Sequence, residues 1–349
     1  MAVYTTIDDP SAYFHSQLYT GTGSSHSVTN DANAGNFKPD WVWIKERSSS
    51  GGHKIYDSTR GVQEAIQTQS SAAETTTAQG LTAFNTDGFT VGSDGGHNQN
   101  SATYVAYQWV AGGGTTASNT DGSITSTVQA NTTAGFSIVK FTGTGSTATV
   151  GHGLGAIPVM IIQKNLDSSA NWSVKHHKTT NNYDFLNLNS SSAATANDSI
   201  WTQTDPTTSV FSIGTATAIN QSGQDQICYC FAEKQGYSKF GKYVGNGDSN
   251  GPFIYTGFKP AFVIVKAAGG TTDWRMNGPD GVFLSANSSA AVYDSAPGPI
   301  DRVSNGFKIR GGDDLRASGG TFIYMAWAKN PFVTSTGVPT TAGSTGPAT

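Results

Sequence analysis

The feature that most constrains this chain is an internal repeat, in which four kinds of segment occur three times in the same order. In each copy a glycine-bearing turn comes first. A proline followed by an apolar strand with a terminal lysine comes next, then a Phe-centred segment, and finally a closing apolar strand. Segments that recur in a fixed order indicate a tandem array of three copies. The turns lie at 18–23, 140–145 and 242–247, the proline-led strands at 39–45, 158–164 and 260–266, the Phe segments at 87–92, 210–214 and 305–309, and the closing strands at 104–109, 227–232 and 322–327.

The length of the copies favours domains over a solenoid. The leading prolines, Pro39, Pro158 and Pro260, stand roughly 100–120 residues apart, which exceeds the ~20–50 residues of a solenoid unit and suits a domain. Short runs of β-branched and aromatic residues alternate with Gly, Asn, Asp and Ser turns, as in antiparallel sandwiches. We therefore expect an all-β protein of three tandem antiparallel β-sandwich domains, jelly-roll or lectin-like in type. The expected boundaries are 1–114, 115–235 and 236–333, with a Thr/Gly/Pro-rich tail over 334–349.

Two local expectations follow from the sequence pattern. The proline-led strand is apolar on both faces, which predicts a central strand with proline at its first position, where no ladder donor is lost. A short helix is expected over 61–66, with Asp57 or Ser58 as its N-cap.

Composition narrows the classes of partner. Charged residues make up 13% of the 349 residues and the formal net charge is −4, so the chain lacks the basic footprint of a nucleic-acid-binding protein. It contains no run of the ~18 apolar residues that a membrane helix needs, and its start does not resemble a signal peptide. The two cysteines, Cys228 and Cys230, would point to the same face of one strand, where a bridge would be strained. We expect buried free thiols.

The titratable residues do not form a recognisable catalytic or metal-binding pattern. The seven histidines are scattered, and the adjacent His176 and His177 are expected at the surface or rim, since neighbours in a strand face opposite ways. Residues 313–316 are expected to form a hairpin turn with a local ion pair. We therefore expect no catalytic residues, no metal and no cofactor.

The tryptophans divide into two groups. Trp172 and Trp274 follow polar turns at matching positions in the second and third copies. If exposed, such rings could stack on a sugar while the side-chain amide of Asn98 binds hydroxyls; a repeated core role fits the same positions. The remaining tryptophans fall in or beside apolar runs and are expected in the core: Trp41, Trp43, Trp109, Trp201 and Trp327.

Four segments resemble a group of virion structural proteins from marine tailed phages, including phages that infect cyanobacteria. They are residues 5–14, 37–45, 56–61 and 330–337. The resemblance spans nearly the whole chain and is strongest in the first copy. It implies a particle component with lectin-like or sandwich domains, and it supplies no catalytic residues.

The expected function is a non-enzymatic structural protein of a tailed-phage virion, made in the bacterial host cytoplasm and exposed as a tail, fibre or capsid-decoration component. The expected partners are further copies of the chain, with a trimer as the simplest assembly, and other virion proteins. The segment from Pro10 to Phe14 and the tail after Pro331 are expected to be docking arms. The alternative is a carbohydrate-binding adhesin for the host surface. A polysaccharide depolymerase is a further alternative, which requires two carboxylates about 5–10 Å apart.

Overall fold

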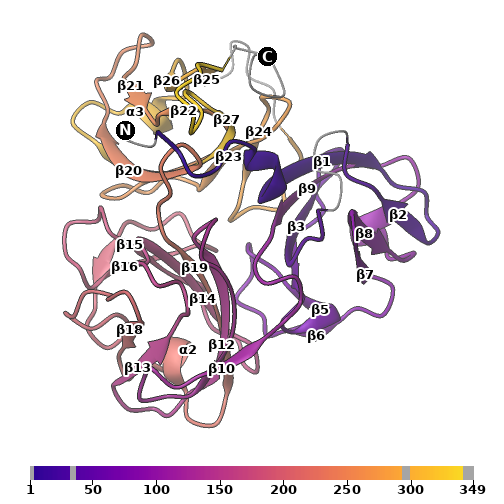
Figure 1. Ribbon diagram of the computed structural model, residues 1–349, viewed down its shortest axis with the longest axis vertical. Helices are drawn as coiled ribbons and strands as arrows, with labels where there is room; N and C mark the ends of the chain where they lie inside the picture. Colours follow the sequence, from indigo (N-terminus) through magenta and orange to yellow (C-terminus); the bar gives the residue numbers. More distant parts are fainter. Residues whose placement is uncertain (1–3, 32–36, 293–298, 341–349) are drawn as a thin grey trace.

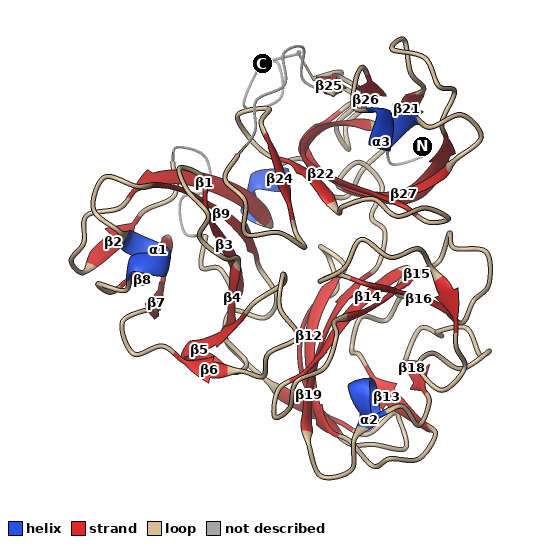
Figure 2. Cartoon of the chain, turned by 180° about the vertical axis from the view of Figure 1, so that it is seen from behind, coloured by secondary structure: helices blue, strands red, loops and turns tan. Residues whose placement is uncertain are grey.

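The computed structural model describes residues 4–31, 37–292 and 299–340 of the chain. It is an all-β protein in which three lobes surround a common centre, and each lobe is built from one repeat (Figure 1). Every lobe pairs one large antiparallel sheet with one small antiparallel sheet, so the fold consists of several β-sandwiches (Figure 2). Among the strands of the described residues, each sheet draws on a single repeat.

In the first repeat the large sheet has the order β1-β9-β3-β4-β5-β6 and the small sheet the order β2-β8-β7. A 3-10 turn, η1 (Pro10–Ala12), precedes β1, and α1 (Gly95–Asn98) lies between β8 and β9. The strands are β1 (Phe14–Thr20), β2 (His26–Val28), β3 (Trp41–Glu46), β4 (Lys54–Asp57), β5 (Gly61–Ile66), β6 (Thr75–Thr76), β7 (Leu81–Asn85), β8 (Gly88–Val91) and β9 (Thr103–Trp109).

In the second repeat the large sheet has the order β10-β11-β12-β19-β14-β15-β16-β17, and the small sheet is the pair β13-β18. The single helix is α2 (Thr217–Asn220). The strands are β10 (Ala117–Asn119), β11 (Ser126–Asn131), β12 (Phe136–Thr142), β13 (Ala148–Gly151), β14 (Met160–Asn165), β15 (Ser173–His176), β16 (Asp184–Asn187), β17 (Thr195–Ala196), β18 (Val210–Ile213) and β19 (Asp225–Phe231).

In the third repeat the large sheet has the order β20-β27-β22-β23-β24 and the small sheet the order β21-β26-β25. The single helix is α3 (Asp313–Arg316). The strands are β20 (Ser238–Val244), β21 (Phe253–Tyr255), β22 (Phe258–Ala267), β23 (Arg275–Asn277), β24 (Phe283–Ser285), β25 (Ile300–Val303), β26 (Gly306–Ile309) and β27 (Thr321–Pro331).

Each large sheet buries both of its faces. On β3, Val42 and Ile44 point into a core inside the first lobe, whereas Trp41 and Trp43 point into a core shared by all three lobes. The second and third repeats have lobe cores of their own and contribute to the same shared core. The repeats are therefore parts of one packed molecule.

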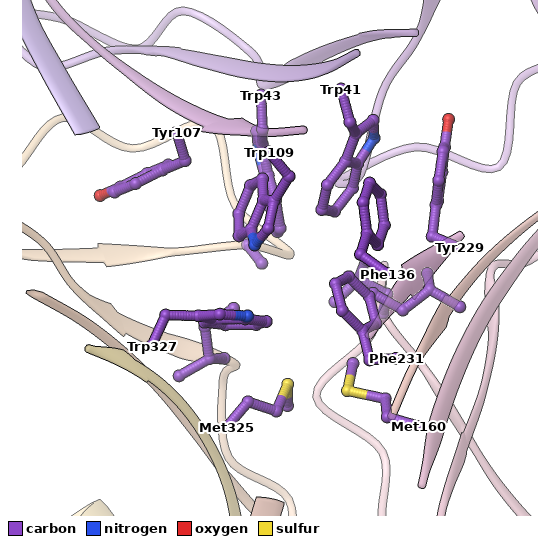
Figure 3. Packing of buried hydrophobic residues seen from close by; sticks show 14 of the residues in the cluster. Trp41, Trp43, Tyr107, Trp109, Phe136, Met160, Tyr229, Phe231, Met325 and Trp327 are labelled. Atoms are coloured by element: carbon purple, nitrogen blue, oxygen red, sulfur yellow. The ribbon is translucent and has the colours of Figure 1, made fainter. Parts of the chain in front are cut away.

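Three aromatic rings, one from the closing strand of each repeat, meet at the centre of the shared core (Figure 3). The ring centroids of Trp109 and Phe231 lie 6.4 Å apart, those of Trp109 and Trp327 5.2 Å, and those of Phe231 and Trp327 5.5 Å. All three pairs are edge-to-face, the geometry that places a positive ring edge against a negative ring face. The three repeats thus surround a pseudo-threefold axis.

The proline-led strand is central in each large sheet and fully buried along β3 and β14, as predicted. The predicted position of the proline is wrong. Pro39 and Pro158 stand two residues before their strands, and Pro260 lies inside β22 at a register shift. A bulge accommodates the missing N–H as well as a strand start does.

The helix predicted over 61–66 is wrong, because these residues form β5. Ala65 packs in the lobe core and Ile66 in the shared core, so consecutive side chains face opposite ways, as in a strand. Asp57 does cap backbone N–H groups, accepting bonds from those of Thr59 (3.1 Å) and Arg60 (2.9 Å), but the turn that it closes joins two strands.

The hairpin turn predicted over 313–316 is the one-turn helix α3. Its Asp314 pairs with Arg275 (2.6 Å) from β23. Each repeat carries such a helix at the same place before its closing strand. Four residues are too few for helical periodicity to be visible in the sequence.

The first docking-arm prediction is wrong, because the N-terminal segment packs inside the molecule. Ile7 and Phe14 are buried in the shared core and Pro10 is buried as well. The carboxylate of Asp8 accepts bonds from the backbone N–H and the hydroxyl of Ser335, both at 2.6 Å. The first repeat is therefore fastened to the segment that follows the third. Of the predicted tail, residues 341–349 lie outside the described residues.

Candidate functional site

The three glycan-binding candidates lie in the interior, and the exposure expected of them is not found. Trp172, Trp274 and Asn98 are each 0% exposed. The side chain of Asn98 accepts a bond from the N–H of Thr22 (2.7 Å) and donates one to the carbonyl of Gly92 (2.8 Å). Asn220 makes the equivalent contacts in the second repeat, so this amide fastens the glycine-bearing turn in both.

Trp172 and Trp274 belong to a cyclic set of hydrogen bonds that joins the three repeats. Trp172 directly precedes β15 and Trp274 directly precedes β23, and His53 holds the same position before β4 in the first repeat. Each of these strands pairs with the central strand of its sheet. Every one of these rings donates an N–H to a backbone carbonyl of another repeat. The bonds run from His53 Nε2 to Ser285 O (3.0 Å), from Trp172 Nε1 to Gln67 O (2.8 Å) and from Trp274 Nε1 to Asn187 O (2.9 Å).

A second cyclic set runs through the backbone. In the three repeats in turn, an N–H in the segment that follows β5, β16 or β24 donates to a carbonyl directly after the central strand of the next repeat. The bonds run from Glu74 N to Leu166 O (2.8 Å), from Ala194 N to Ala268 O (2.7 Å) and from Val292 N to Arg47 O (3.0 Å). The two cycles close the ring, so each repeat is bound to both of the others.

His53 serves this ring as a neutral imidazole. Its Nδ1 accepts the indole N–H of Trp43 (2.8 Å), so the proton must reside on Nε2, which donates to Ser285. Burial, followed by the nearby charge of Lys45, lowers the pKa of His53 to about 3. The neutral imidazole of His53 therefore donates the inter-repeat hydrogen bond that an indole N–H donates in the other two repeats.

The expected surface or rim position of His176 is wrong, since this side chain is buried between the second and third repeats. Its Nδ1 accepts the N–H of Lys178 (3.2 Å) and its Nε2 faces the carbonyl of Tyr324 (3.4 Å). Burial, followed by the charge of His177, lowers the pKa of His176 to about 3. His177 is exposed and bonds to the carbonyl of Phe240 (2.9 Å), so both rings bind the third repeat.

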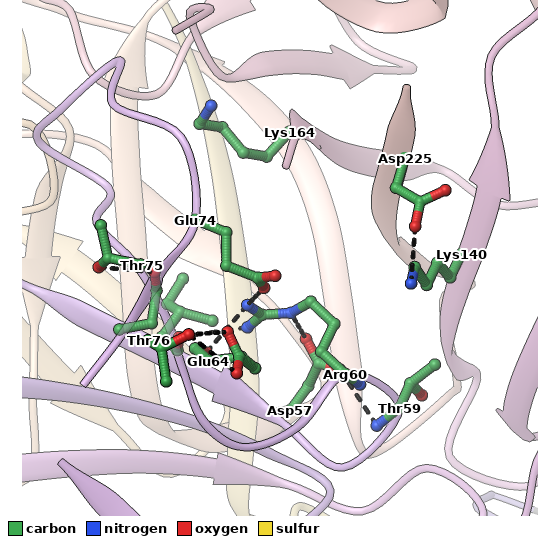
Figure 4. Close-up of polar contacts among 12 residues, drawn as sticks. Asp57, Thr59, Arg60, Glu64, Glu74, Thr75, Thr76, Lys140, Lys164 and Asp225 are labelled. Carbon is green, nitrogen blue, oxygen red and sulfur yellow. Dashed lines mark hydrogen bonds and ion pairs between the residues drawn. The ribbon is translucent and has the colours of Figure 1, made fainter. Parts of the chain in front are cut away.

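A buried ionic cluster fills the junction between the first and second repeats (Figure 4). Arg60 donates to the carboxylate of Asp57 (2.6 Å) and to that of Glu74, and the hydroxyl of Tyr229 donates to Asp57 (2.7 Å). The pKa of Arg60 is raised, because the two carboxylates and Tyr229 outweigh the effect of its burial. Sequence reasoning missed this cluster because Tyr229, the member from the second repeat, lies 172 residues from Asp57 in the chain.

Three buried lysines stand at equivalent places, at the ends of the central strands. Lys45, Lys164 and Lys266 are each 0% exposed, and each donates to the backbone carbonyl of the following residue. Burial lowers the pKa of all three to about 8. Within the described residues their partners are backbone carbonyls and not acidic side chains, so these lysines hold the loop that follows each strand.

The pseudo-threefold symmetry is broken at one junction. The Arg60 cluster seals the junction between repeats one and two, and an ion pair of Arg47 with Asp280 bridges repeats three and one. Between repeats two and three the structure leaves an open cleft of about 630 Å³. Two alanines line it at positions where each of the other junctions carries one charged side chain. Ala194 aligns with Glu74 and Val292, and Ala268 aligns with Leu166 and Arg47.

The chemistry of this cleft is polar. The carboxylate of Asp184 accepts hydrogen bonds from the backbone N–H (2.8 Å) and the side-chain amide (3.0 Å) of Asn181, and Asp314 forms an ion pair with Arg275. Lys178 and Lys242 line the cleft without an ion-pair partner in the part of the chain that the structure describes. Such a lining can bind polar or anionic groups, but its one aromatic side chain, Phe322, is buried and offers no stacking surface.

Within the described ranges, no group of three or more His, Cys, Asp or Glu side chains could hold a metal ion. Cys228 and Cys230 are buried free thiols in the second lobe core, as predicted, and burial raises the pKa of both. None of the described helices has the length and apolar character needed to cross a membrane.

Comparison with known proteins yields a family but no characterised relative. No curated protein and no solved structure matches this chain. A family described as a domain of unknown function (DUF7483) matches residues 9–331, which include all three repeats. The chain therefore belongs to the DUF7483 family.

Proposed function

We propose that this chain is a non-enzymatic structural protein of a tailed-phage virion, exposed at the particle surface as a tail, fibre or capsid-decoration component. The observation that supports it best is the closed ring of three repeats around one aromatic core. Two cycles of hydrogen bonds and a terminal clasp fasten every repeat to its neighbours. This construction suits a protein that must stay folded outside a cell, where no chaperone rescues it.

The sequence resemblance supplies the virion assignment, and the architecture is compatible with it. The segments that carry the resemblance are structural ones: β3, the Asp57 turn and the end of β27 position the shared core and the junctions. The lectin-like type of the sandwiches belongs to the same proposal and is supported by the pairing of a large with a small antiparallel sheet in every lobe.

The pseudo-threefold shape gives the expected self-association a specific form. One chain already presents three similar lobes around an axis, so it matches a threefold position on a particle without a homotrimer. Contacts with other virion proteins, and with further copies where the particle repeats, would then occur on the lobe surfaces. Synthesis in the host cytoplasm is part of this proposal.

The test is quantitative mass spectrometry of purified virions, with the major capsid protein as the internal standard for copy number. Immunogold labelling with an antibody to the chain then locates it. Hundreds of copies on the head would indicate decoration, whereas a few copies at the tail would indicate a tail or fibre component. Absence from purified particles, with the chain abundant in the infected-cell lysate, would refute the proposal.

A further inference from the structure

Exposed aromatic side chains gather at one end of the third lobe. Tyr4, Phe253, Tyr255 and Phe332 are 54%, 47%, 60% and 36% exposed. No other Phe, Tyr or Trp of the described ranges reaches this degree of exposure. Single exposed apolar residues are ordinary, but a cluster of them marks a binding surface.

The repeat supplies an internal comparison for two of these residues. The register of β21 with β26 aligns Tyr255 with Thr29 and Gly151, and Phe253 with Ser27 and Thr149, in the other two repeats. At these two places the first repeat carries the exposed Ser27 and Thr29, the second carries the half-buried Thr149 and the buried Gly151, and the third carries aromatic rings. The fold does not require aromatic rings at these positions, so something else must account for them.

Tyr4, Tyr255 and Phe332 line one cleft of about 400 Å³, whereas Phe253 does not line it. Three segments converge there. The N–H of Phe332 donates to the carbonyl of Gly257 (3.0 Å), and the hydroxyl of Thr5, next to Tyr4, donates to the carbonyl of Gln235 (2.9 Å). Gly257 has a φ of +82°, which favours glycine at the turn beside Tyr255. The volume falls within the ~300–1,000 Å³ that small-molecule sites occupy.

Polar groups stand beside the rings in the same cleft. Glu233 and Lys239 form an ion pair (2.5 Å) whose side chains remain 30% and 39% exposed. Gln235, Ser238 and Thr256 complete the polar lining. The cleft thus combines aromatic faces with a carboxylate, an ammonium, an amide and hydroxyl-bearing side chains.

We propose that this cleft is a saccharide-binding site. A pyranose ring has a face of C–H groups, which are weakly positive and are attracted by the negative face of an aromatic ring, and an edge of hydroxyls that need donors and acceptors. Tyr255 and Phe332 would supply the stacking faces, and Glu233 with Lys239 the hydroxyl partners. Because these groups stay partly hydrated in the free protein, a saccharide can replace water at modest cost.

A protein partner fits the cleft less well. A stable protein interface buries about 800 Å² on each side, with a continuous apolar centre. Here the aromatic rings are separated by charged and polar groups, and the surface is concave and small. The inference goes beyond the proposed virion role and does not depend on it, since the copy number in particles is measured independently of any ligand.

The experiment uses the full chain and an array of immobilised bacterial O-antigen and capsular oligosaccharides, together with cellobiose, maltose and N,N′-diacetylchitobiose. Isothermal titration with the array hit gives the affinity. The test variant is Tyr255→Thr, which installs the residue of the first repeat. The matched control is Phe253→Ser, an equivalent replacement two residues away on the same strand but outside the cleft.

We expect Tyr255→Thr to weaken binding by about tenfold or more, which corresponds to ~1.4 kcal/mol, while Phe253→Ser stays close to the unmodified chain. Phe332→Ser should weaken binding as well, and thermal unfolding of each variant checks that the fold is retained. Absence of any array hit for the unmodified chain overturns the proposal, and so does undiminished binding by Tyr255→Thr. If light scattering shows self-association that both Tyr255→Thr and Phe253→Ser abolish, the patch is a protein contact and the proposal is also wrong.

Discussion

The hydrogen bond from Trp172 to Gln67 provides the sharpest test of how the repeats are joined. Replacing Trp172 by Phe keeps an aromatic ring in the shared core but removes the indole N–H that reaches the first repeat. The carbonyl of Gln67 then retains the longer bond that it accepts from the backbone N–H of Ser70 (3.3 Å). The lost hydrogen bond costs about 0.5–1.5 kcal/mol of unfolding free energy, on top of the loss from a smaller ring.

A second tryptophan of the same repeat separates these two contributions. Trp201 is equally buried at 0% exposed, yet its indole N–H has no hydrogen-bond partner within the described structure. Trp201→Phe therefore removes ring volume without breaking a hydrogen bond. Trp172→Phe should be more destabilising than Trp201→Phe by about 0.5–1.5 kcal/mol, and Trp274→Phe should behave like Trp172→Phe.

The assay is equilibrium unfolding in urea, followed by far-ultraviolet circular dichroism so that the loss of one fluorophore does not affect the signal. The free energy of unfolding is compared among the three variants at equal slope. Equal destabilisation by Trp172→Phe and Trp201→Phe would refute the role assigned to the inter-repeat bond. A change below about 0.5 kcal/mol for Trp172→Phe would instead indicate an exposed ring, as the glycan-binding interpretation assumed.

Three further predictions concern charge and packing. Arg60→Met should lower the free energy of unfolding by about 3–5 kcal/mol, because it leaves buried carboxylates without their cation. Arg310→Met, at an exposed ion pair, should lower it by at most about 1 kcal/mol. Urea titrations that rank the two variants the other way would contradict the buried cluster. His53 has a folded-state pKa lowered to about 3, so its stabilising contribution is complete above the unfolded-state pKa of ~6.5 and is lost as pH falls from there towards 3. The free energy of unfolding of His53→Gln, measured by urea titration, should therefore fall less steeply over that range, by up to about 1.4 kcal/mol per pH unit. An unchanged slope would count against a buried neutral imidazole. Gly143→Ala places a Cβ 2.3 Å from a backbone carbonyl oxygen and should lower the free energy of unfolding by about 1–3 kcal/mol. In Gly95→Ala the new Cβ meets nothing within 4 Å, so the free energy of unfolding should change by no more than about 0.5 kcal/mol. Thermal unfolding of the two variants provides the comparison.

The sequence predicted the parts of the fold that depend on local pattern. Alternating and fully apolar runs identified the central strands, and the core positions of Trp41, Trp109 and Trp201 followed from the runs around them. The same-face placement of Cys228 and Cys230 followed from strand geometry. These features survive because a strand's side-chain period of two holds whatever packs against it.

The interior roles of Trp172 and Trp274 could not be predicted in the same way. Both follow polar turns, and the partners that bury them lie in another repeat, roughly 100 residues away in the sequence. Their matching positions did suggest a repeated core role. The missing signal was His53, which takes the same position with a different ring and so hid the threefold pattern from a search by residue type.

The aromatic cleft was missed for a related reason. The three copies were aligned on what they share, whereas the cleft depends on what one copy changes: Tyr255 stands where the others carry Thr29 and Gly151. In a repeat whose scaffold is fixed by common residues, an exposed aromatic ring that only one copy carries contributes nothing to the common fold. Departures from the repeat at solvent-facing positions therefore indicate function, just as agreement at buried positions indicates structure. The open junction beside Ala194 obeys the same rule, because small side chains replace there the charged groups that seal the other two junctions.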